Sequence, residues 1–379
     1  MSCSGSPSVT REIDSIRVVQ VAPTPFGDDG LFGGGERYPL ELARALARSV
    51  DCELVTFGRA LRLVREDGGL RIRVLRAVAH LRGHPAHPLA PALPAAVRAA
   101  DIVHTHHLRS APSQVAILAG RLAGAKVTVT DHGLGRGGLP GWFPGLVHRF
   151  LPVSQYSART LRAPARKTTV IYGGADPDRF RPEPAERRAG VLFVGRFTPH
   201  KGLDRLLQAL PDGARLTCVG TAGHDPRPPE SGYPELLRRL AAGRQVTFAE
   251  RVSDDELPRL YRRAQVLVLP SVHENCYGRR LAISELLGLS VLEAMASGTP
   301  VVCSRLGGLP EIVADGETGH LVEPGDVDEL RDRLEAVLGD PDGANRMGRA
   351  ARESVVERFT WSACAERCLT AYGELAVDS

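Results

Sequence analysis

The chain has few of the features that build disulfide frameworks or membrane spans. Its 379 residues include seven cysteines, an odd number, and no Cys-x-x-Cys pair, which argues for reduced thiols and against a zinc or disulfide framework. No apolar run is long enough to cross a membrane, and the polar segment 1–15 has no signal-peptide core. We therefore expect a cytoplasmic protein, at most peripheral to a membrane and without a transmembrane segment.

Lysine is nearly absent, so arginine supplies most of the basic charge. Residues 1–185 hold 24 Lys and Arg against 15 Asp and Glu, and the remaining residues hold 24 against 29. The basic first part suits an anionic acceptor or a membrane surface, and equally a solvated arginine-rich surface. Lys201 is one of only three lysines, which indicates that a compact ammonium group is required at that position.

Short β-branched runs alternate with helical periodicity in both halves of the chain. This alternation is typical of α/β folds with doubly wound parallel sheets, and the length predicts two domains. We expect a first domain over 1–185, a second over 186–360 and a final helix over 361–379. A ligand would lie between the sheets, at the carboxyl ends of the strands. The predicted strands are 17–22, 102–104, 127–130, one around Val153, 191–194, 216–219, 246–248, 266–269, 300–303 and 320–322.

A loop in the second half predicts phosphate binding. Arg196 and Lys201 lie between an apolar strand and a helix with a leucine stripe. A cation near a helix start is unfavourable by a few tenths to about 1 kcal/mol. A charge-assisted hydrogen bond to phosphate contributes about 1.5 to 3 kcal/mol, so binding would outweigh that cost.

A second segment places carboxylates around a glycine-bearing helix start. If Gly288 marks the turn, Leu289 and Ser290 present backbone N–H groups to a phosphate. Carboxylates do not bind phosphate, so Glu285 and Glu293 are expected to bind hydroxyl groups. Phosphate beside carboxylates that bind a polyol suggests a nucleotide sugar.

The first half carries weaker signals for the same ligand. Gly34 and Gly35 belong to a glycine run that follows the first strand, where backbone can approach a phosphate closely. A purely structural turn is the competing interpretation, and the run lacks the full dinucleotide pattern, so NAD is not favoured. His132 follows a strand at its carboxyl end, where a site histidine is favoured over a packing one.

No metal site is predicted. His104, His106 and His107 lie at the end of a strand without a carboxylate cluster, and adjacent side chains there alternate between faces. Three Asp-x-Asp triplets fall at expected turns or helix starts, where Asp is favoured as a cap; they are 176–178, 326–328 and 340–342. We expect no metal and no cofactor other than the nucleotide sugar as co-substrate.

Together these motifs resemble the retaining glycosyltransferases of family 4. That family has the GT-B architecture, two facing Rossmann-like domains with the donor site in the cleft between them. The resemblance spans nearly the whole chain, the 195–202 loop included, and is most specific in the Pro-Ser pair at 270–271 and in the Glu-x7-Glu run with the residues that follow it, 293–302. It also implies that the final helix, 361–375, returns to the first domain.

The resemblance implies roles for the residues already named. Arg196 and Lys201 would bind the donor diphosphate, Glu293 the ribose and Glu285 the hydroxyls of the transferred sugar. The 33–35 loop and His132 would approach the sugar and phosphate from the first domain. The catalytic set is then Glu285, His132, Arg196 and Lys201.

The chain departs from the family pattern at two places. The Pro-Ser pair at 270–271 is usually followed, after two residues, by the first glutamate, which here would be Glu274. The Glu-x7-Glu spacing selects Glu285 instead and makes 275–284 an insertion, so both glutamates stay open. The usual Asn-Gly-x-Asp appears as Gly-Gly-Ala-Asp at 173–176, so a glycine stands where the family has the asparagine.

The implied activity is transfer of a hexose-like sugar, with retention, from a UDP or GDP sugar to a hydroxyl or amino acceptor. The acceptor would be a small natural product, a saccharide or a lipid-linked molecule, and no nucleic-acid partner is expected. A front-face and a covalent mechanism both stay open. The alternatives are a nucleotide-sugar epimerase of the same architecture and a noncatalytic nucleotide-sugar-binding subunit.

Overall fold

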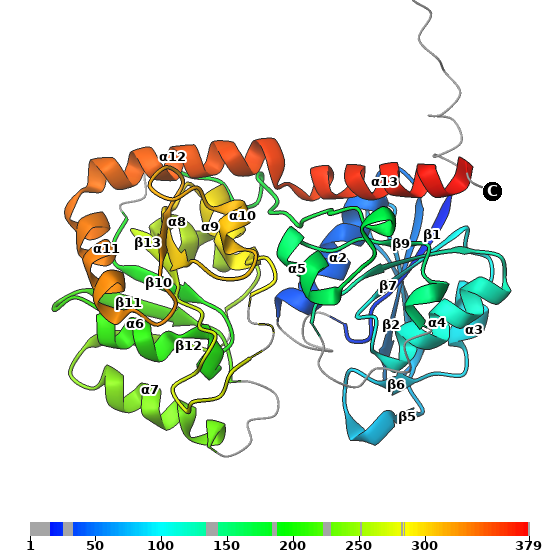
Figure 1. Ribbon diagram of the computed structural model, residues 1–379, viewed down its shortest axis with the longest axis horizontal. Coiled ribbons are helices and arrows are strands. Elements are labelled where there is room, and N and C mark those ends of the chain that lie inside the picture. The colour runs from blue at the N-terminus through cyan, green and yellow to red at the C-terminus, as the bar shows by residue number, and fades with distance from the viewer. Residues whose placement is uncertain are drawn as a thin grey trace, which may run out of the picture. The chain divides into compact units, whose positions relative to one another are not determined.

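The computed structural model describes residues 16–25, 33–133, 143–183, 188–222, 229–250, 252–281, 283 and 285–377. Contacts divide the chain into two compact units: unit 1 combines Met1–Gly173 with Trp361–Ser379, and unit 2 is Gly174–Thr360. Each unit is a sheet flanked by helices (Figure 1). Residues 174–183, which the sequence placed in the first domain, thus fall in unit 2, where Ala175 N donates to Phe359 O at 2.9 Å.

Unit 1 contains a seven-stranded sheet in the order β3-β4-β2-β1-β7-β8-β9. All of its neighbouring pairs are parallel except β3 with β4. A small antiparallel pair is formed by β5 (Ala79–His80) and β6 (Pro88–Leu89). The strands of the large sheet are β1 (Arg17–Val21), β2 (Asp51–Gly58), β3 (Arg62–Arg65), β4 (Arg71–Arg76), β7 (Ile102–His106), β8 (Lys126–Thr130) and β9 (Arg149–Phe150).

The helices of unit 1 bury the apolar faces of this sheet. A cluster of valines from β1, β2, β7 and β8 packs against Leu93, Val97 and Ile117. The helix α13 lies along α2 (Figure 1), where the rings of Tyr38 and Trp361 are 5.1 Å apart. The helices are α2 (Gly34–Leu46), α3 (Leu93–Val97), α4 (Ala111–Leu122), α5 (Gln155–Leu161), α13 (Trp361–Val377) and the 3-10 turns η1 (Leu81–Gly83), η2 (Phe143–Leu146) and η3 (Ala165–Lys167).

Unit 2 contains a six-stranded parallel sheet in the order β12-β11-β10-β13-β14-β15. Its strands are β10 (Val191–Val194), β11 (Arg215–Val219), β12 (Gln245–Ala249), β13 (Val266–Leu269), β14 (Val301–Ser304) and β15 (His320–Val322). The central strand β13 is buried along its whole length, as expected for a sheet covered on both faces. The predicted leucine stripe is buried in α6.

The helices of unit 2 follow its strands in turn. They are α6 (Leu203–Ala209), α7 (Tyr233–Ala241), α8 (Leu257–Arg263), α9 (Leu289–Ala296), α10 (Leu309–Ile312), α11 (Val327–Gly339), α12 (Pro341–Arg358) and the 3-10 turns η4 (Pro199–Lys201) and η5 (Glu230–Gly232). This alternation of strand and helix brings the loops after β10, β13 and β14 to one edge of the sheet.

The strand predicted around Val153 is wrong. Val153 follows β9, and Ser154 already caps α5, since its Oγ accepts from Ser157 N at 2.9 Å. The preceding Pro152 has no N–H to extend the strand. The remaining predicted strands have counterparts, and β2, β3, β4, β5, β6 and β9 were missed.

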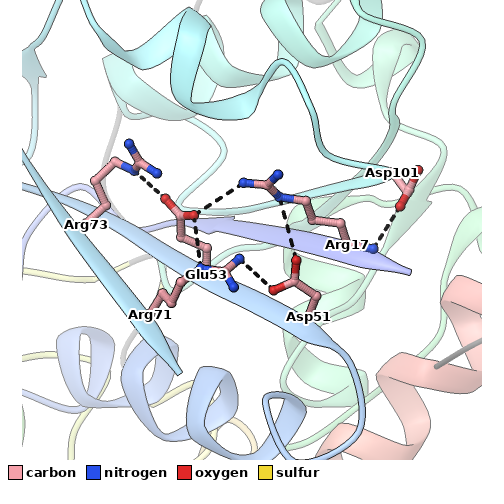
Figure 2. Close-up of polar contacts among 6 residues, drawn as sticks. All are labelled: Arg17, Asp51, Glu53, Arg71, Arg73 and Asp101. Carbon is pink, nitrogen blue, oxygen red and sulfur yellow. Dashed lines mark hydrogen bonds and ion pairs between the residues drawn. The ribbon is translucent and has the colours of Figure 1, made fainter. Parts of the chain in front are cut away.

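An ion-pair cluster explains why arginine-rich β4 nevertheless forms a strand (Figure 2). Glu53 on β2 has a side chain that is 1% exposed, and its oxygens lie near three guanidinium groups. Arg17 and Arg71 approach within 3.5 and 3.6 Å, and Arg73 also hydrogen-bonds to it. Most of these residues lie at the amino ends of their strands, opposite the edge where ligands bind in such folds, so the cluster is structural.

Candidate functional site

The loop after β10 lies directly against the residues that follow β13. Gly202 has a positive φ of +69°, and a Cβ there would lie 1.9 Å from the carbonyl oxygen of Pro270. Val272 N donates to His200 O at 2.9 Å. Because β10 and β13 are parallel neighbours, the two loops meet at the carboxyl edge of the sheet, and only glycine fits where they touch.

Lys201 and Glu285, 84 positions apart in the sequence, form a close ion pair. Lys201 Nζ lies 2.6 Å from Glu285 Oε2, and the two side chains are 15% and 9% exposed. Ser271 Oγ donates to the same carboxylate oxygen at 3.1 Å. Desolvating two charges is costly unless they are paired and hydrogen-bonded, and this arrangement satisfies that condition.

Arg196 belongs to the same loop and is exposed. Burial is the main cause that lowers the pKa of His200 to about 3, and the positive charges of Lys201 and then Arg196 add to it. His200 is therefore neutral at pH 7, and the basic character of this loop comes from Arg196 and Lys201.

The carbonyl group of Glu285 is held by two glycines that the sequence reasoning missed. Gly308 N donates to Glu285 O at 3.0 Å. A Cβ at Gly307, whose φ is +63°, would lie 1.8 Å from that oxygen, and one at Gly308 would lie 2.3 Å from Leu286 O. The available signal was the Gly-Gly-Leu-Pro run at 307–310, which begins three residues after the end of β14.

The helix α9 begins at the predicted turn. Gly288 is its N-cap with φ +97°, and no side chain caps the helix. Leu289 and Ser290 are its first residues, so their N–H groups precede the intrahelical hydrogen-bond ladder and suit an anion. Glu293 is only 6% exposed, and the hydroxyl of Tyr261 donates to its Oε2 at 2.8 Å. Tyr261, from α8, is a second contact that the sequence gave no reason to expect.

Glu274 lies in a different environment from Glu285. Its side chain is 49% exposed and pairs with Arg280 at 2.7 Å. Asn275 closes a tight turn by accepting from Tyr277 N and Arg279 N at 3.0 and 3.1 Å. The partner of Lys201 is thus Glu285. The segment expected as an insertion begins as a hairpin, and the side-chain amide of Asn275 in this hairpin donates to Glu230 at 2.9 Å.

In unit 1 the glycine run and His132 come together. Gly34 and Gly35 open α2, and a Cβ at Gly35 would lie 3.6 Å from His107 Cε1 and 3.8 Å from His132 Cβ. His132 follows β8 and is partly exposed. Burial, followed by the charges of nearby histidines, lowers its pKa well below the ordinary value, so the imidazole is neutral at pH 7.

Comparison with solved structures identifies the fold. Sucrose-phosphate synthase from Thermosynechococcus elongatus matches with a TM-score of 0.72 and 23% identity, over 96% of this chain and 100% of that one. HepE from Anabaena in complex with UDP and glucose matches with a TM-score of 0.72 and 18% identity, over 96% and 100%. The two Rossmann-like sheets and these likenesses show the GT-B fold.

Family models cover both halves of the chain. The model described as Glycosyltransferase Family 4 matches residues 32–179, and the model described as Glycosyl transferases group 1 matches residues 175–354. The chain belongs to glycosyltransferase family 4.

Curated relatives match about half of their own length. The GDP-mannose-dependent alpha-(1-6)-phosphatidylinositol monomannoside mannosyltransferase of Mycobacterium tuberculosis is 36% identical over 54% of this chain and 55% of its own. The D-inositol 3-phosphate glycosyltransferase of Corynebacterium diphtheriae is 35% identical over 55% and 51%. Among the residues that the structure describes, no helix combines the length and apolar character needed to span a bilayer.

Proposed function

We propose that the protein transfers a hexose from a UDP- or GDP-type sugar to a hydroxyl acceptor, with retention at the anomeric carbon and without a metal. The observation that carries this proposal is the buried ion pair between Lys201 and Glu285. Lys201 lies on the same loop as Arg196. A cation suits a diphosphate, and a carboxylate accepts hydrogen bonds from sugar hydroxyls. Such a donor needs both groups side by side.

The proposed chemistry depends on charge that develops at the leaving group. As the glycosidic bond breaks, negative charge grows on the diphosphate. Lys201, Arg196 and the N–H groups of Leu289 and Ser290 then stabilise the transition state more than the ground state. Glu285 positions the sugar through its hydroxyls. The acceptor hydroxyl passes its proton to the departing diphosphate oxygen as its own oxygen bonds to the anomeric carbon on the same face.

We propose an anionic, lipid-linked acceptor at a membrane surface. The names of the two relatives above specify acceptors that carry a phosphate. Segment 59–82 of unit 1 has seven arginines against two acidic residues, and it exposes Leu61, Leu63 and Val78 by 68%, 55% and 63%. Arginines beside exposed apolar side chains suit an anionic lipid surface, which supports peripheral association.

The experiment begins with a thermal-shift panel of UDP, GDP and ADP sugars, because a ligand that binds the native state raises the melting temperature. The preferred donor is then incubated with phosphatidylinositol-type acceptors in vesicles and with soluble polyol phosphates. Product anomers are read by NMR, with and without EDTA. Inversion, or loss of turnover in EDTA, would contradict the proposed stereochemistry or metal independence.

Two matched alanine variants test the site. We expect Glu285→Ala to lower turnover by about a hundredfold or more, because the sugar loses a positioning contact. Glu274→Ala removes a carboxylate from the exposed hairpin and should leave turnover unchanged. If Glu285→Ala is as active as the unaltered protein, the assigned site is wrong. If donor alone is converted to a second sugar isomer, the protein is an epimerase.

A further inference from the structure

Three imidazole rings of unit 1 form a stacked row. The rings of His104 and His106 are 4.7 Å apart at 20°, and those of His106 and His132 are 5.4 Å apart at 15°. His104 and His106 are 0% exposed, whereas His132 is partly exposed. The row thus leads from the interior of the β7 strand to the carboxyl edge of the sheet.

Hydrogen bonds around Gln20 give the row a direction. The Gln20 amide nitrogen lies 3.9 Å from Cys52 Sγ, and its Oε1 lies 2.7 Å from His106 Nε2. In this amide orientation Gln20 Oε1 accepts from Nε2–H of His106, and His106 accepts through Nδ1. His132 Nε2 lies 3.1 Å from that Nδ1, so His132 donates from Nε2, because the network assigns the tautomer of each neutral ring.

We propose that His106 and Gln20 are positioning residues that hold His132 as the Nε2–H tautomer and leave its Nδ1 as an acceptor for a hydroxyl of the sugar donor or the acceptor. This inference rests on the proposed function, in which His132 approaches the transferred sugar. A histidine whose second nitrogen is fixed by a hydrogen bond presents one defined atom to its ligand. An unfixed ring would present a donor part of the time and lose that contact.

The surroundings keep the rings neutral, which the tautomer requires. Among the described residues, the groups that contact His132 include His106, the ring of His107 at 5.0 Å and the ring of Tyr38 at 4.7 Å. Burial lowers the pKa of His106 well below its ordinary value, and neighbouring histidines lower it further. Each ring therefore has one N–H and one lone pair at pH 7.

His104 supplies a matched control on the same strand. It is as deeply buried as His106, but its bonds lead elsewhere: Nε2 lies 2.8 Å from Thr130 Oγ1, and Nδ1 lies 2.6 Å from the hydroxyl of Tyr372. Its replacement should affect stability as replacement of His106 does, without releasing His132.

The first test reads the tautomer directly, whatever the activity. In ¹⁵N-histidine-labelled full-length protein, the signals of His132 are identified by their loss in His132→Ala. We expect the Nε2–H form in the unaltered protein and in His104→Leu. His106→Leu should give a mixture of tautomers, and His106→Asn should restore one form, because its Oδ1 takes the place of Nδ1. An Nδ1–H form at the start, or no change in His106→Leu, overturns the proposal.

The second test measures sugar transfer by folded variants. We expect His106→Leu and Gln20→Leu to lower kcat about tenfold to a hundredfold, with recovery in His106→Asn and little loss in His104→Leu. Adding His106→Leu to His132→Ala should cause no further loss, whereas additive effects would overturn the inference. Full activity of His132→Ala would show that His132 has no role in transfer and would overturn the inference. Absence of transfer by the unaltered protein with every donor would contradict the proposed function instead.

Discussion

At the scale of single residues, the site depends on glycines that leave room for backbone. Gly307 combines a φ of +63° with a virtual Cβ 1.8 Å from Glu285 O, whereas Gly316, at φ +80°, has nothing within 4 Å of such a Cβ. Alanine at Gly316 would therefore report only the cost of the left-handed backbone, whereas alanine at Gly307 would add the cost of a steric clash. Only the collision would displace Glu285.

We expect Gly316→Ala to lower the free energy of unfolding by about 1 to 2 kcal/mol, the cost of a left-handed alanine. Gly307→Ala should cost more and also reduce sugar transfer, since Glu285 O must move away from the new methyl group. Chemical unfolding and steady-state turnover measure the two effects. Equal effects of the two substitutions on turnover would show that the Gly307 contact does not position Glu285.

At the scale of elements, the first strands of unit 1 depend on the buried carboxylate of β2. Three arginines from β1 and β4 surround Glu53, while Asp51 at the start of β2 is 43% exposed. Removing one partner leaves the remaining buried or half-buried charges uncompensated. Removing an exposed partner costs little, because water takes its place.

We expect Glu53→Gln to lower the free energy of unfolding of unit 1 by about 2 to 3 kcal/mol, since the arginines stay partly hydrated. Asp51→Asn should cost at most about 1 kcal/mol. Urea unfolding followed by circular dichroism provides both values. A Glu53→Gln loss no larger than that of Asp51→Asn would mean that the cluster does not stabilise the sheet.

The same strands show where sequence reasoning ends. Patterns fixed by local chemistry were predictable: the apolar runs of β10 and β13, the leucine stripe of α6 and the glycine at the start of α9. Arg71 and Arg73 gave no strand signal, because the carboxylate that pairs with them comes from β2. The Lys201–Glu285 contact likewise depends on parallel pairing of β10 and β13, which brings distant loops together. In the sequence, the Glu-x7-Glu spacing favoured Glu285 while the Pro-Ser pair favoured Glu274.

At the scale of the whole molecule, unit 1 gathers buried histidines that make its stability sensitive to acid. Unit 1 buries His104 and His107, whose pKa values are lowered to about 3, together with His106, whose pKa is lowered well below its ordinary value. Their unfolded-state pKa is about 6.5. Above that pH these imidazole rings are neutral in both the folded and the unfolded state. Below it the rings bind protons in the unfolded state but stay neutral in the folded state. Asp131, whose pKa burial raises, opposes the trend with a single group.

We expect the free energy of unfolding of unit 1 to be steady above about pH 6.5 and to fall as the pH drops towards 4, by up to about 1.4 kcal/mol per pH unit for each buried histidine. Trp361 packs against Tyr38 in unit 1, so its fluorescence in urea reports on this unit. His104→Gln should reduce the slope by about one proton, whatever its effect on stability at pH 7.5. An unchanged slope would mean that His104 is protonated in the native state, since a ring that binds its proton equally in both states contributes nothing to the pH dependence.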